Sequence, residues 1–352
     1  MMRPDAAFWR GRRVVLTGHT GFKGAWAALW LRQLGATVTG ISLAPDTQPN
    51  LFELANIASD TDSYLVDIRD LDAVRDIVGH ANPEVVIHMA AQALVRRSYR
   101  EPVDTFASNV MGTVNVLEAV RAAKTVKACL VVTSDKVYEN DGQGRAFDED
   151  ARLGGHDPYS ASKAAAEVVA ASYRQSFFEA RTQLATARGG NVIGGGDFSE
   201  DRIVPDVWRA HRSNEPLVLR YPDATRPWQH VLDCIAGYLV FAERLSTGAT
   251  TEHALNFGPR EGGVLPVRNL VAAMQAAIGA TQDWVQAPGA LPKEMPALAL
   301  SCGRAERAVG WHSLLNPQAT IDWTADWYKA FARNEDMRTV TIRQIAAHGA
   351  LT

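Results

Sequence analysis

The sequence predicts an α/β fold built on a doubly wound parallel sheet, with a smaller mixed α/β lobe toward the C-terminus. Two observations carry this prediction. Short apolar segments typical of buried strands alternate with segments of helical length up to about residue 193, and a glycine-rich turn follows the first strand. The 352 residues are enough to bury a sizeable core in two lobes.

Six strands are expected in the first lobe, at 13–17, 37–42, 63–66, 84–88, 127–133 and 183–188. The helices between them are expected at 21–34, 70–80, about 102–123 and 158–179. Beyond the glycines at 194–196 the sequence changes to shorter segments rich in Pro, Arg and Trp. In this region Trp228–Leu245 is typical of a strand and a helix that return to the first lobe.

The glycine-rich turn has three glycines at a spacing of three residues, Gly18, Gly21 and Gly24. Gly18 allows a tight turn, Gly21 lets the backbone approach a pyrophosphate, and Gly24 lets the next helix pack close to the sheet. That helix begins at Phe22 and would direct its free N–H groups at the phosphates. A dinucleotide site is favoured over an ordinary βα turn, because a second strand follows at the expected distance.

We therefore expect a Rossmann-type domain at 1–193, which takes back a returning segment at about 228–258. The substrate lobe would comprise 194–227 and 259–335, and residues 336–352 would form a loosely held tail.

The sequence favours NAD over NADP as the cofactor. No arginine follows the second predicted strand, where it could bind a 2′-phosphate, and no acid ends that strand to bind a ribose 2′-hydroxyl. His19 and Lys23 add positive charge in the first turn. Asp46 is a poorly placed candidate for the ribose. Asp67, after the third strand, is expected to contact adenine, although an acid at a helix start is an equally good interpretation.

Composition excludes several classes of partner. The 36 basic and 39 acidic residues are well mixed and give a net charge of −3. This charge pattern does not predict binding to nucleic acid or to an anionic membrane. Cys129, Cys234 and Cys302 lack the spacing of a metal site, so no metal is expected, and they indicate a reducing compartment. With no membrane-length apolar run and no secretory signal, a cytoplasmic protein is expected.

The spacing of Tyr159 and Lys163 predicts acid–base chemistry, because residues four apart share one face of a helix. We expect Lys163 to lower the phenol pKa and to hold the nicotinamide ribose, which makes Tyr159 a general base. The pattern alone would describe a surface helix pair. Its position after the fifth strand, where ligands of such sheets bind, favours catalysis.

The fifth strand runs into Ser134, Asp135 and Lys136. Ser134 can share a hydrogen bond with a substrate hydroxyl that faces Tyr159. An acid–base pair beside it exceeds what a simple dehydrogenase needs and suits a reaction that also breaks a C–O bond. The alternative interpretation is a solvated Asp-Lys turn.

Two expected helices carry a second apolar stripe that could pair subunits as a four-helix bundle. The stripes comprise Val110, Val114 and Leu117 on one helix and Val168, Val169, Tyr173 and Phe177 on the other. A homodimer is therefore expected, with a tetramer left open, and the alternative is that both stripes are core.

Together these motifs, with segments 88–92, 190–197 and 226–231, resemble the CDP-glucose 4,6-dehydratase branch of the NAD-dependent epimerase/dehydratase family, within the extended short-chain dehydrogenase/reductase superfamily. The resemblance covers about residues 8–335. Sister sugar-nucleotide dehydratases carry Asp-Glu where this chain has Asp135-Lys136. Segment 293–303 departs from the pattern, since a histidine is missing and Glu294 holds the place of its acidic neighbour.

The resemblance implies an NAD-dependent hydro-lyase of deoxysugar and lipopolysaccharide O-antigen biosynthesis. It would convert CDP-D-glucose to CDP-4-dehydro-6-deoxy-D-glucose by C4 oxidation, loss of water across C5 and C6, and hydride return to C6. In this scheme Tyr159 is the base at C4, Asp135 protonates the departing hydroxyl, and Lys136 is the base at C5. Lys136 could act so only if burial or nearby positive charge kept it partly neutral.

The resemblance also implies binding residues. The cofactor would contact Gly18, His19, Thr20, Gly21, Phe22, Lys23, Asp67, Ile68, Ala90, Ala91, Gln92, Asn109, Thr133, Tyr159 and Lys163. The substrate would contact Gln92, Ser134, Asn191, Arg202, Arg220, Arg226 and Arg260. The alternatives are a related sugar-nucleotide epimerase, which needs no proton donor to C6, and a non-catalytic sensor, which would be expected to lose Tyr159, Lys163 or Ser134.

Overall fold

The computed structural model describes residues 2–178, 182–260, 262–289 and 295–351, so Glu294 lies outside the described residues. Its main sheet has seven strands, all paired in parallel, in the order β11-β7-β5-β4-β1-β2-β3. These strands are β1 (Arg13–Thr17), β2 (Thr37–Ser42), β3 (Asp62–Leu65), β4 (Val85–His88), β5 (Ala128–Val132), β7 (Gln183–Gly189) and β11 (Ala254–Phe257). The predicted parallel sheet is confirmed.

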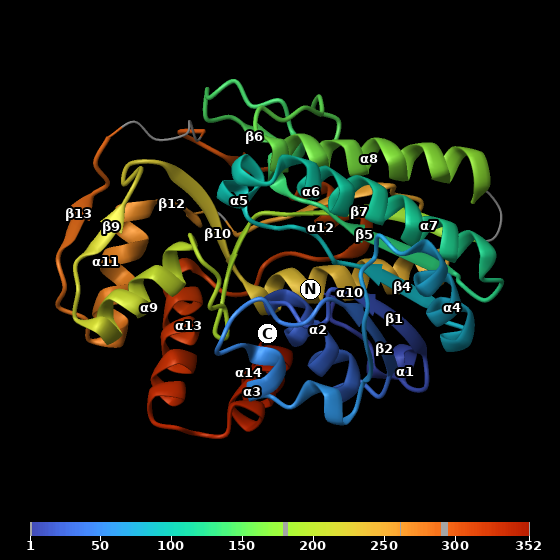
Figure 1. Cartoon of the computed structure of the whole chain (residues 1–352), viewed down its shortest axis with the longest axis horizontal. Helices are drawn as coiled ribbons and strands as arrows, with labels where there is room; N and C mark the ends of the chain where they lie inside the picture. The colour runs from blue at the N-terminus through green and yellow to red at the C-terminus, as the bar shows by residue number, and fades with distance from the viewer. Residues whose placement is uncertain (1, 179–181, 261, 290–294, 352) are drawn as a thin grey trace.

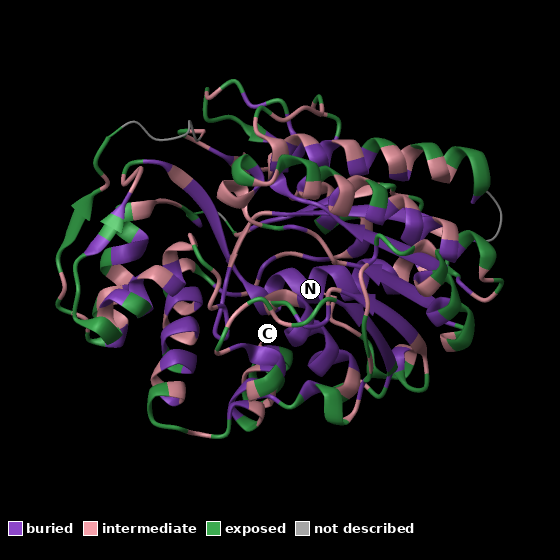
Figure 2. Cartoon of the chain, in the orientation of Figure 1, coloured by how far each residue is buried: buried purple, intermediate pink, exposed green. Residues whose placement is uncertain are grey.

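Helices cover both faces of this sheet (Figure 1). One face packs against α4 (Leu71–Ala81), α7 (Gly112–Ala122) and α8 (Pro158–Phe177), and the other against α2 (Phe22–Gln33) and α10 (Val231–Ser246). Strand alternation supplies both cores, since Val14 and Leu16 join the α2–α10 core and Val15 joins the opposite one. The central strands are accordingly buried along their length (Figure 2), as the apolar runs predicted.

Strand register aligns the ends of the central strands. Thr17 of β1 pairs with His88 of β4, His88 with Val131 of β5, and Val131 with Thr186 of β7. The segments that follow these strands therefore leave the sheet on the same side, at the carboxyl ends of the strands.

The helix expected at about 102–123 is divided into α6 (Pro102–Phe106), a π-helical turn η2 (Ala107–Met111) and α7. Such a turn is common at functional sites. Here it contains the buried Asn109, whose amide reaches both β4's following loop and α8.

The C-terminal lobe is built around a three-stranded sheet, β12 (Val264–Pro266), β10 (Thr225–His230) and β8 (Asn191–Ile193). Parallel pairs β9 (Leu217–Leu219) with β13 (Trp284–Gln286), and β6 (Ala146–Phe147) with β14 (Ala299–Leu300), complete the described strands. The helices here are α9 (Ile203–Ser213), α11 (Val267–Ile278), α12 (Gly303–Val309) and α13 (Pro317–Ala332). Short elements α1 (Ala6–Trp9), α3 (Leu51–Leu54), η1 (Ile57–Ser59), α5 (Val95–Arg100) and η3 (Asp135–Val137) connect the rest.

The expected strand and helix at Trp228–Leu245 are present as β10 and α10, and β11 then joins the edge of the main sheet. The domain boundaries stay a prediction.

The prediction of a loosely held tail is wrong, because α14 (Met337–Ala350) packs against α2. Its buried His348 Nε2 lies 2.8 Å from Asp233 Oδ1 of α10, and Arg338 pairs with Asp60 at 2.6 Å. Val340 and Ile345 are also buried. The helix has polar and apolar residues around its whole circumference, so its sequence lacks the one-sided stripe that reveals an amphipathic helix.

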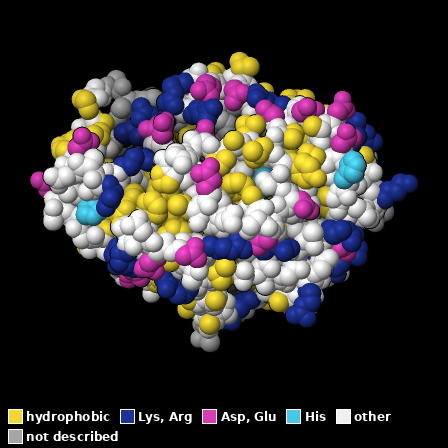
Figure 3. All heavy atoms as spheres, turned by 60° about the horizontal axis from the view of Figure 1, so that its bottom comes forward, with side chains coloured by type: hydrophobic (Ala, Val, Ile, Leu, Met, Phe, Trp, Pro, Cys, Tyr) yellow, Lys and Arg dark blue, Asp and Glu magenta, His cyan; other side chains and the backbone are white. Residues whose placement is uncertain are grey.

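The surface carries no single-sign patch on the face shown in Figure 3, where basic and acidic side chains are interspersed. Within the described ranges, no helix is long and apolar enough to cross a membrane.

The Asp233–His348 contact gives a test of how α14 is held. Burial raises the pKa of Asp233, but the hydrogen bond and charge of His348 and the N–H of Leu314 outweigh it and hold the pKa below its ordinary value. Asp233→Asn should therefore lower the free energy of unfolding by about 3 kcal/mol or more at neutral pH, because it leaves the buried His348 without its charged hydrogen-bond acceptor. The loss should shrink as pH falls through the lowered carboxyl pKa.

Urea unfolding of Asp233→Asn and of Asp326→Asn, an exposed pair on α13, would measure this effect. The control should change stability by less than about 0.5 kcal/mol. Equal stability of the two variants would contradict the role assigned to the pair.

Candidate active site

A cavity of about 800 Å³ lies where the carboxyl ends of the central strands face the C-terminal lobe. The main-lobe residues that line it include Lys23, Thr133, Ser134, Asp135, Lys136 and Tyr159. The C-terminal lobe contributes Asn191, Arg202, Arg220 and Arg226. Segments that are far apart in the sequence thus meet in one hollow.

The glycine turn beside this cavity is packed too closely for any side chain at two positions. A Cβ on Gly24 would lie 1.9 Å from the Gly18 carbonyl oxygen, and one on Gly18 would lie 2.7 Å from the nitrogen of Ala90. Gly18 also has φ of +78°, where glycine is favoured. Gly21 precedes α2 without a side-chain cap, so the helix N-terminus is left for a ligand. The cradle fits a dinucleotide pyrophosphate.

His19 does not supply the positive charge expected of it. Burial lowers the pKa of His19 to about 4, so the ring is neutral near pH 7. Its Nε2 lies 2.6 Å from Ser63 Oγ, and a Cβ on Gly40 would lie 2.4 Å from the ring. His19 therefore fills the space above β2. Burial also lowers the pKa of Lys23, and the charge of Arg202 lowers it further.

Thr20 and Ile68 are two further cofactor candidates of the main lobe. Thr20 Oγ1 bonds to Ser42 Oγ at 2.7 Å and to the Leu43 carbonyl at 2.9 Å, so a hydroxyl pair ends β2. Ile68 lies against the start of α7, where a Cβ on Gly112 would meet its Cδ1 at 2.4 Å.

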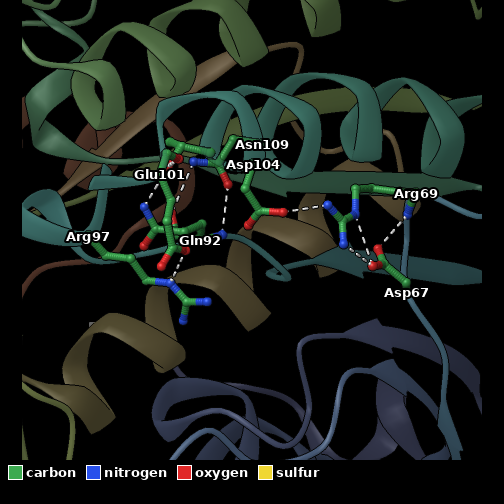
Figure 4. Close-up of polar contacts among 8 residues, drawn as sticks. Asp67, Arg69, Gln92, Arg97, Glu101, Asp104 and Asn109 are labelled. Carbon is green, nitrogen blue, oxygen red and sulfur yellow. Dashed lines mark hydrogen bonds and ion pairs between the residues drawn. The ribbon is translucent and has the colours of Figure 1, made fainter. Parts of the chain in front are cut away.

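The two acids considered for the adenosine are engaged by arginines, and Figure 4 shows Asp67 with Arg69. Asp67 accepts hydrogen bonds from the backbone N–H and guanidinium of Arg69, and these bonds hold its pKa below its ordinary value. Asp46 pairs with Arg97 at 3.0 Å. Asp67 does not cap α4, since Asp70 does, and its contact with adenine stays a prediction.

Gln92 is not brought to the cavity lining, contrary to its expected role toward substrate. Its Nε2 donates to Thr105 and its Oε1 accepts from the Leu94 N–H, while its backbone bonds Asn109 (Figure 4). Asn109 also donates to Ser162 Oγ at 2.8 Å on α8. Gln92 and Asn109 therefore join the loop after β4, which includes Ala91, to the helix that carries Tyr159.

The segment after β5 forms the turn η3, capped by Ser134, whose Oγ accepts from the Lys136 N–H. Ser134 Oγ also donates to Asp135 Oδ1 at 3.0 Å. The other oxygen, Oδ2, is buried without a hydrogen-bond partner in the described structure. Lys136 Nζ lies 3.8 Å from Asp135, and its side chain keeps 27% exposure, so the expected burial of this lysine is only partial.

Tyr159 and Lys163 share one face of α8, but their electrostatics differ from expectation. Burial raises the pKa of Tyr159, while a hydrogen bond with Ser134 lowers it. Burial and the nearby charge of Lys23 lower the pKa of Lys163 to about 7. Lys163 Nζ donates to the Val132 carbonyl at 3.1 Å. The lowered phenol pKa is therefore not found, because desolvation exceeds the favourable contributions.

The arginines of the C-terminal lobe are balanced by two acids. Arg220 pairs with Asp201 at 3.0 Å, and Arg202 pairs with Asp197 at 3.5 Å. Arg226 is buried in β10 beside Thr225. Arg260, also expected to bind substrate, is exposed and does not line the cavity.

Sequence reasoning missed Arg96, His156 and Asp201, which all line the cavity. Arg96 pairs with Asp201 at 2.9 Å, so one carboxylate joins arginines of both lobes. Only the basic segment at 95–100 signalled such a role, and nothing local separates Arg96 from its neighbours.

The model of the family described as "NAD dependent epimerase/dehydratase family" matches residues 14–258. The chain belongs to this family. NAD is accordingly its cofactor, and the glycine cradle and the uncapped α2 are the features that fit it.

Among curated members, a CDP-glucose 4,6-dehydratase of Salmonella typhimurium is 42% identical, with 99% of each chain covered. The UDP-glucose 4-epimerase of Thermus thermophilus, solved as a complex with NAD, gives a TM-score of 0.79 at 25% identity and covers 90% of this chain and 99% of its own. A Bacillus anthracis dTDP-glucose 4,6-dehydratase in complex with NAD gives 0.77 at 20% identity, covering 92% and 97%. At this identity the last comparison supports the fold.

Gly24→Ala tests the cradle. The added Cβ meets backbone atoms of Gly18 and His19, which cannot yield as a side chain would, so the turn must shift. NAD affinity should fall by at least about tenfold, since a misplaced turn loses its contacts to the phosphates. Isothermal titration of NAD is the measurement.

Gly79→Ala in α4 is the matched control, because its Cβ would meet nothing within 4 Å. It should keep full NAD affinity and gain up to about 1 kcal/mol of stability. Unchanged NAD binding by Gly24→Ala would mean that the cradle does not hold the cofactor.

Proposed function

We propose that the protein is a CDP-glucose 4,6-dehydratase. The observation that carries this proposal is the 42% identity to the Salmonella typhimurium enzyme over 99% of both chains. The geometry agrees, since Asp135 and Lys136 line the same cavity as Tyr159. A 4-epimerase has no need of this acid–base pair, so the dehydratase is favoured.

The diphosphate of the substrate would lie among Arg202, Arg220 and Arg226. Arginine pairs well with phosphate oxygens through two parallel hydrogen bonds. Helix α9 begins beside them without a side-chain cap, and its first residues, Ile203 and Val204, line the cavity. Its N-terminal N–H groups add favourable partial charge. Asn191, at the start of β8, offers an amide on the same wall.

When bound, NAD supplies the acceptor for the C4 hydride and the donor of the hydride that returns to C6. In the first step Tyr159, as the phenolate, takes the proton of the C4 hydroxyl and leaves a 4-keto sugar. Ser134, hydrogen-bonded to Tyr159, orients the reacting hydroxyl. Burial disfavours this phenolate, and the charge of protonated Lys163 opposes that effect.

The ketone acidifies the C5 proton, which Lys136 removes as the free amine, the proton of this pair then residing on Asp135, 3.8 Å away. Asp135 gives its proton to the departing C6 hydroxyl, and water is lost. The unpartnered Oδ2 of Asp135 leaves an oxygen free for that hydroxyl. After C6 is reduced, Lys136 returns its proton to C5, and transfer of the Tyr159 proton to Asp135 restores both groups. The sum is the loss of one water.

Incubation with CDP-glucose, dTDP-glucose, UDP-glucose and GDP-mannose, with NAD added, tests the function. Mass spectrometry would follow the loss of one water, and alkaline absorbance the 4-keto sugar. Turnover of CDP-glucose is expected. Turnover of another nucleotide alone would contradict the substrate assignment, and no water loss from any would contradict the dehydratase.

Two substitutions should separate oxidation from elimination. Lys136→Ala should stop water loss but still oxidise C4, because Tyr159 remains, so reduced cofactor should accumulate. Tyr159→Phe should slow both by about 10²–10⁴-fold, the usual contribution of a placed acid–base group. Single-turnover absorbance of reduced nicotinamide gives the measurement. Full dehydratase activity of Lys136→Ala would show that the base at C5 is another group.

We also propose that the protein is a homodimer paired through α6, η2, α7 and α8. Leu117 of the expected stripe is core, whereas Val168 and Phe177 are 61% and 53% exposed. Val103 and Met111 extend this apolar face and are 82% and 53% exposed. Exposed apolar patches of this kind mark interfaces. The free thiols of Cys129, Cys234 and Cys302 suit a reducing, cytoplasmic setting.

Val168→Asp should shift the protein from dimer to monomer, because a carboxylate would be desolvated at the interface. Sedimentation equilibrium would measure the mass. Val285→Asp, at an equally apolar exposed position on β13, is the control and should leave association unchanged. Dimers that survive Val168→Asp would exclude this interface.

A further inference from the structure

Glu167 is a buried carboxylate on α8, one helical turn beyond Lys163. Its Oε1 accepts from Thr133 Oγ1 at 2.5 Å and from Arg188 Nε at 3.0 Å. Its Oε2 accepts from Thr186 Oγ1 at 2.7 Å and from Arg188 Nη2 at 2.8 Å. The carboxylate is therefore fully hydrogen-bonded, and Arg188 is also buried.

The Glu167–Arg188 ion pair holds both ends of the segment that carries Ser134, Asp135 and Lys136. Thr133, just before the segment, donates to Glu167. Tyr138, just after it, accepts at 2.9 Å from Arg188 Nη1, which also donates to the Glu149 carbonyl. Tyr138 in turn donates to Asn256 on β11 at 2.6 Å.

Helix α8 also carries Tyr159 and Lys163, so the pair joins the two segments on which the proposed chemistry depends. Burying two charges is expensive, and well-packed apolar residues of similar volume often stabilise a core as well or better. Stability alone does not call for an ion pair here.

Glu167 also belongs to the charged surroundings of Lys163. Lys23 faces that ammonium from α2, the neutral His88 from β4, and Glu167 from α8 itself. Glu167 raises the pKa of Lys163, while burial and Lys23 lower it to about 7.

We propose that Glu167 and Arg188 are positioning residues, which fix Ser134, Asp135 and Lys136 against Tyr159. The inference rests on the proposed dehydratase activity and deepens it. Neither residue lines the cavity, so both act through the residues that do.

Glu167→Gln is the first test. It should lower kcat by roughly 10- to 100-fold through misplacement of the segment. KM should stay within about threefold of wild type, because no substrate contact is removed. Without the negative charge the pKa of Lys163 falls further, so the alkaline limb of the kcat–pH profile should move to lower pH. Glu84→Gln, in a carboxylate–arginine pair at the amino ends of the central strands, should leave kcat and the profile unchanged.

A milder pair of variants covers the case in which Glu167→Gln does not fold. Thr133→Val and Thr186→Val each remove one hydroxyl bond to the same carboxylate at nearly constant volume. Only Thr133 adjoins Ser134. Thr133→Val should therefore lower kcat by about tenfold and Thr186→Val by less than about twofold, and Thr133→Ser should restore activity.

Equal losses in Thr133→Val and Thr186→Val would reduce the pair to a structural role and overturn the proposal. A folded Glu167→Gln with wild-type kcat and pH profile would do the same. Wild type is assayed beside every variant. If wild type eliminates no water from any nucleotide sugar, the proposed function is wrong. If wild type is active and a folded Glu167→Gln has the same kcat and pH profile, only this inference is wrong.

Discussion

The register of the central parallel strands is the constraint on which the rest of the site depends. Thr17, His88 and Val131 lie side by side, so the glycine turn, the loop at Ala90 and the segment after β5 leave the sheet at the same level. A shift by one residue would exchange the two faces of a strand. Val14 and Val15 pack in opposite cores, so a strand shifted in this way would not bury the same apolar side chains. The register that packs the two cores is therefore also the register that brings the catalytic segments together.

The site combines backbone rigidity with balanced charge. At Gly18 and Gly24 backbone touches backbone, which leaves no freedom for the turn. Across the cavity, Asp201 pairs with both Arg96 and Arg220, so two cations of the lining are held in fixed directions before any anion binds. Electrostatic attraction and geometric order are both present without the substrate, which reduces the cost of binding.

Local sequence patterns predicted the sheet and its helices. They also predicted the cavity-lining residues, because Ser134, Asp135 and Lys136 follow a strand and Tyr159 has a helical spacing to Lys163. They did not reveal α14, whose residues are covered from several directions. They also assigned charge to His19 and a lowered pKa to Tyr159, whereas burial dominates both. Arg96 and Asp201 were missed because their meeting depends on how the lobes face each other. Desolvation and long-range contact are tertiary properties, which spacing along a chain does not encode.

The position of α14 against the main lobe has a consequence for the order in which the chain folds as it leaves the ribosome. Asp233 lies within α10, near the centre of the molecule, yet its partners are Ser313, Leu314, Leu315 and His348. Until residue 348 has left the exit tunnel, this carboxylate has no complete set of partners and α10 cannot bury it without cost. Synthesis proceeds from the N-terminus, so the main lobe waits on His348, which is made 115 residues after Asp233. The core around Asp233 is therefore completed late, after all the strands of the main sheet have been made.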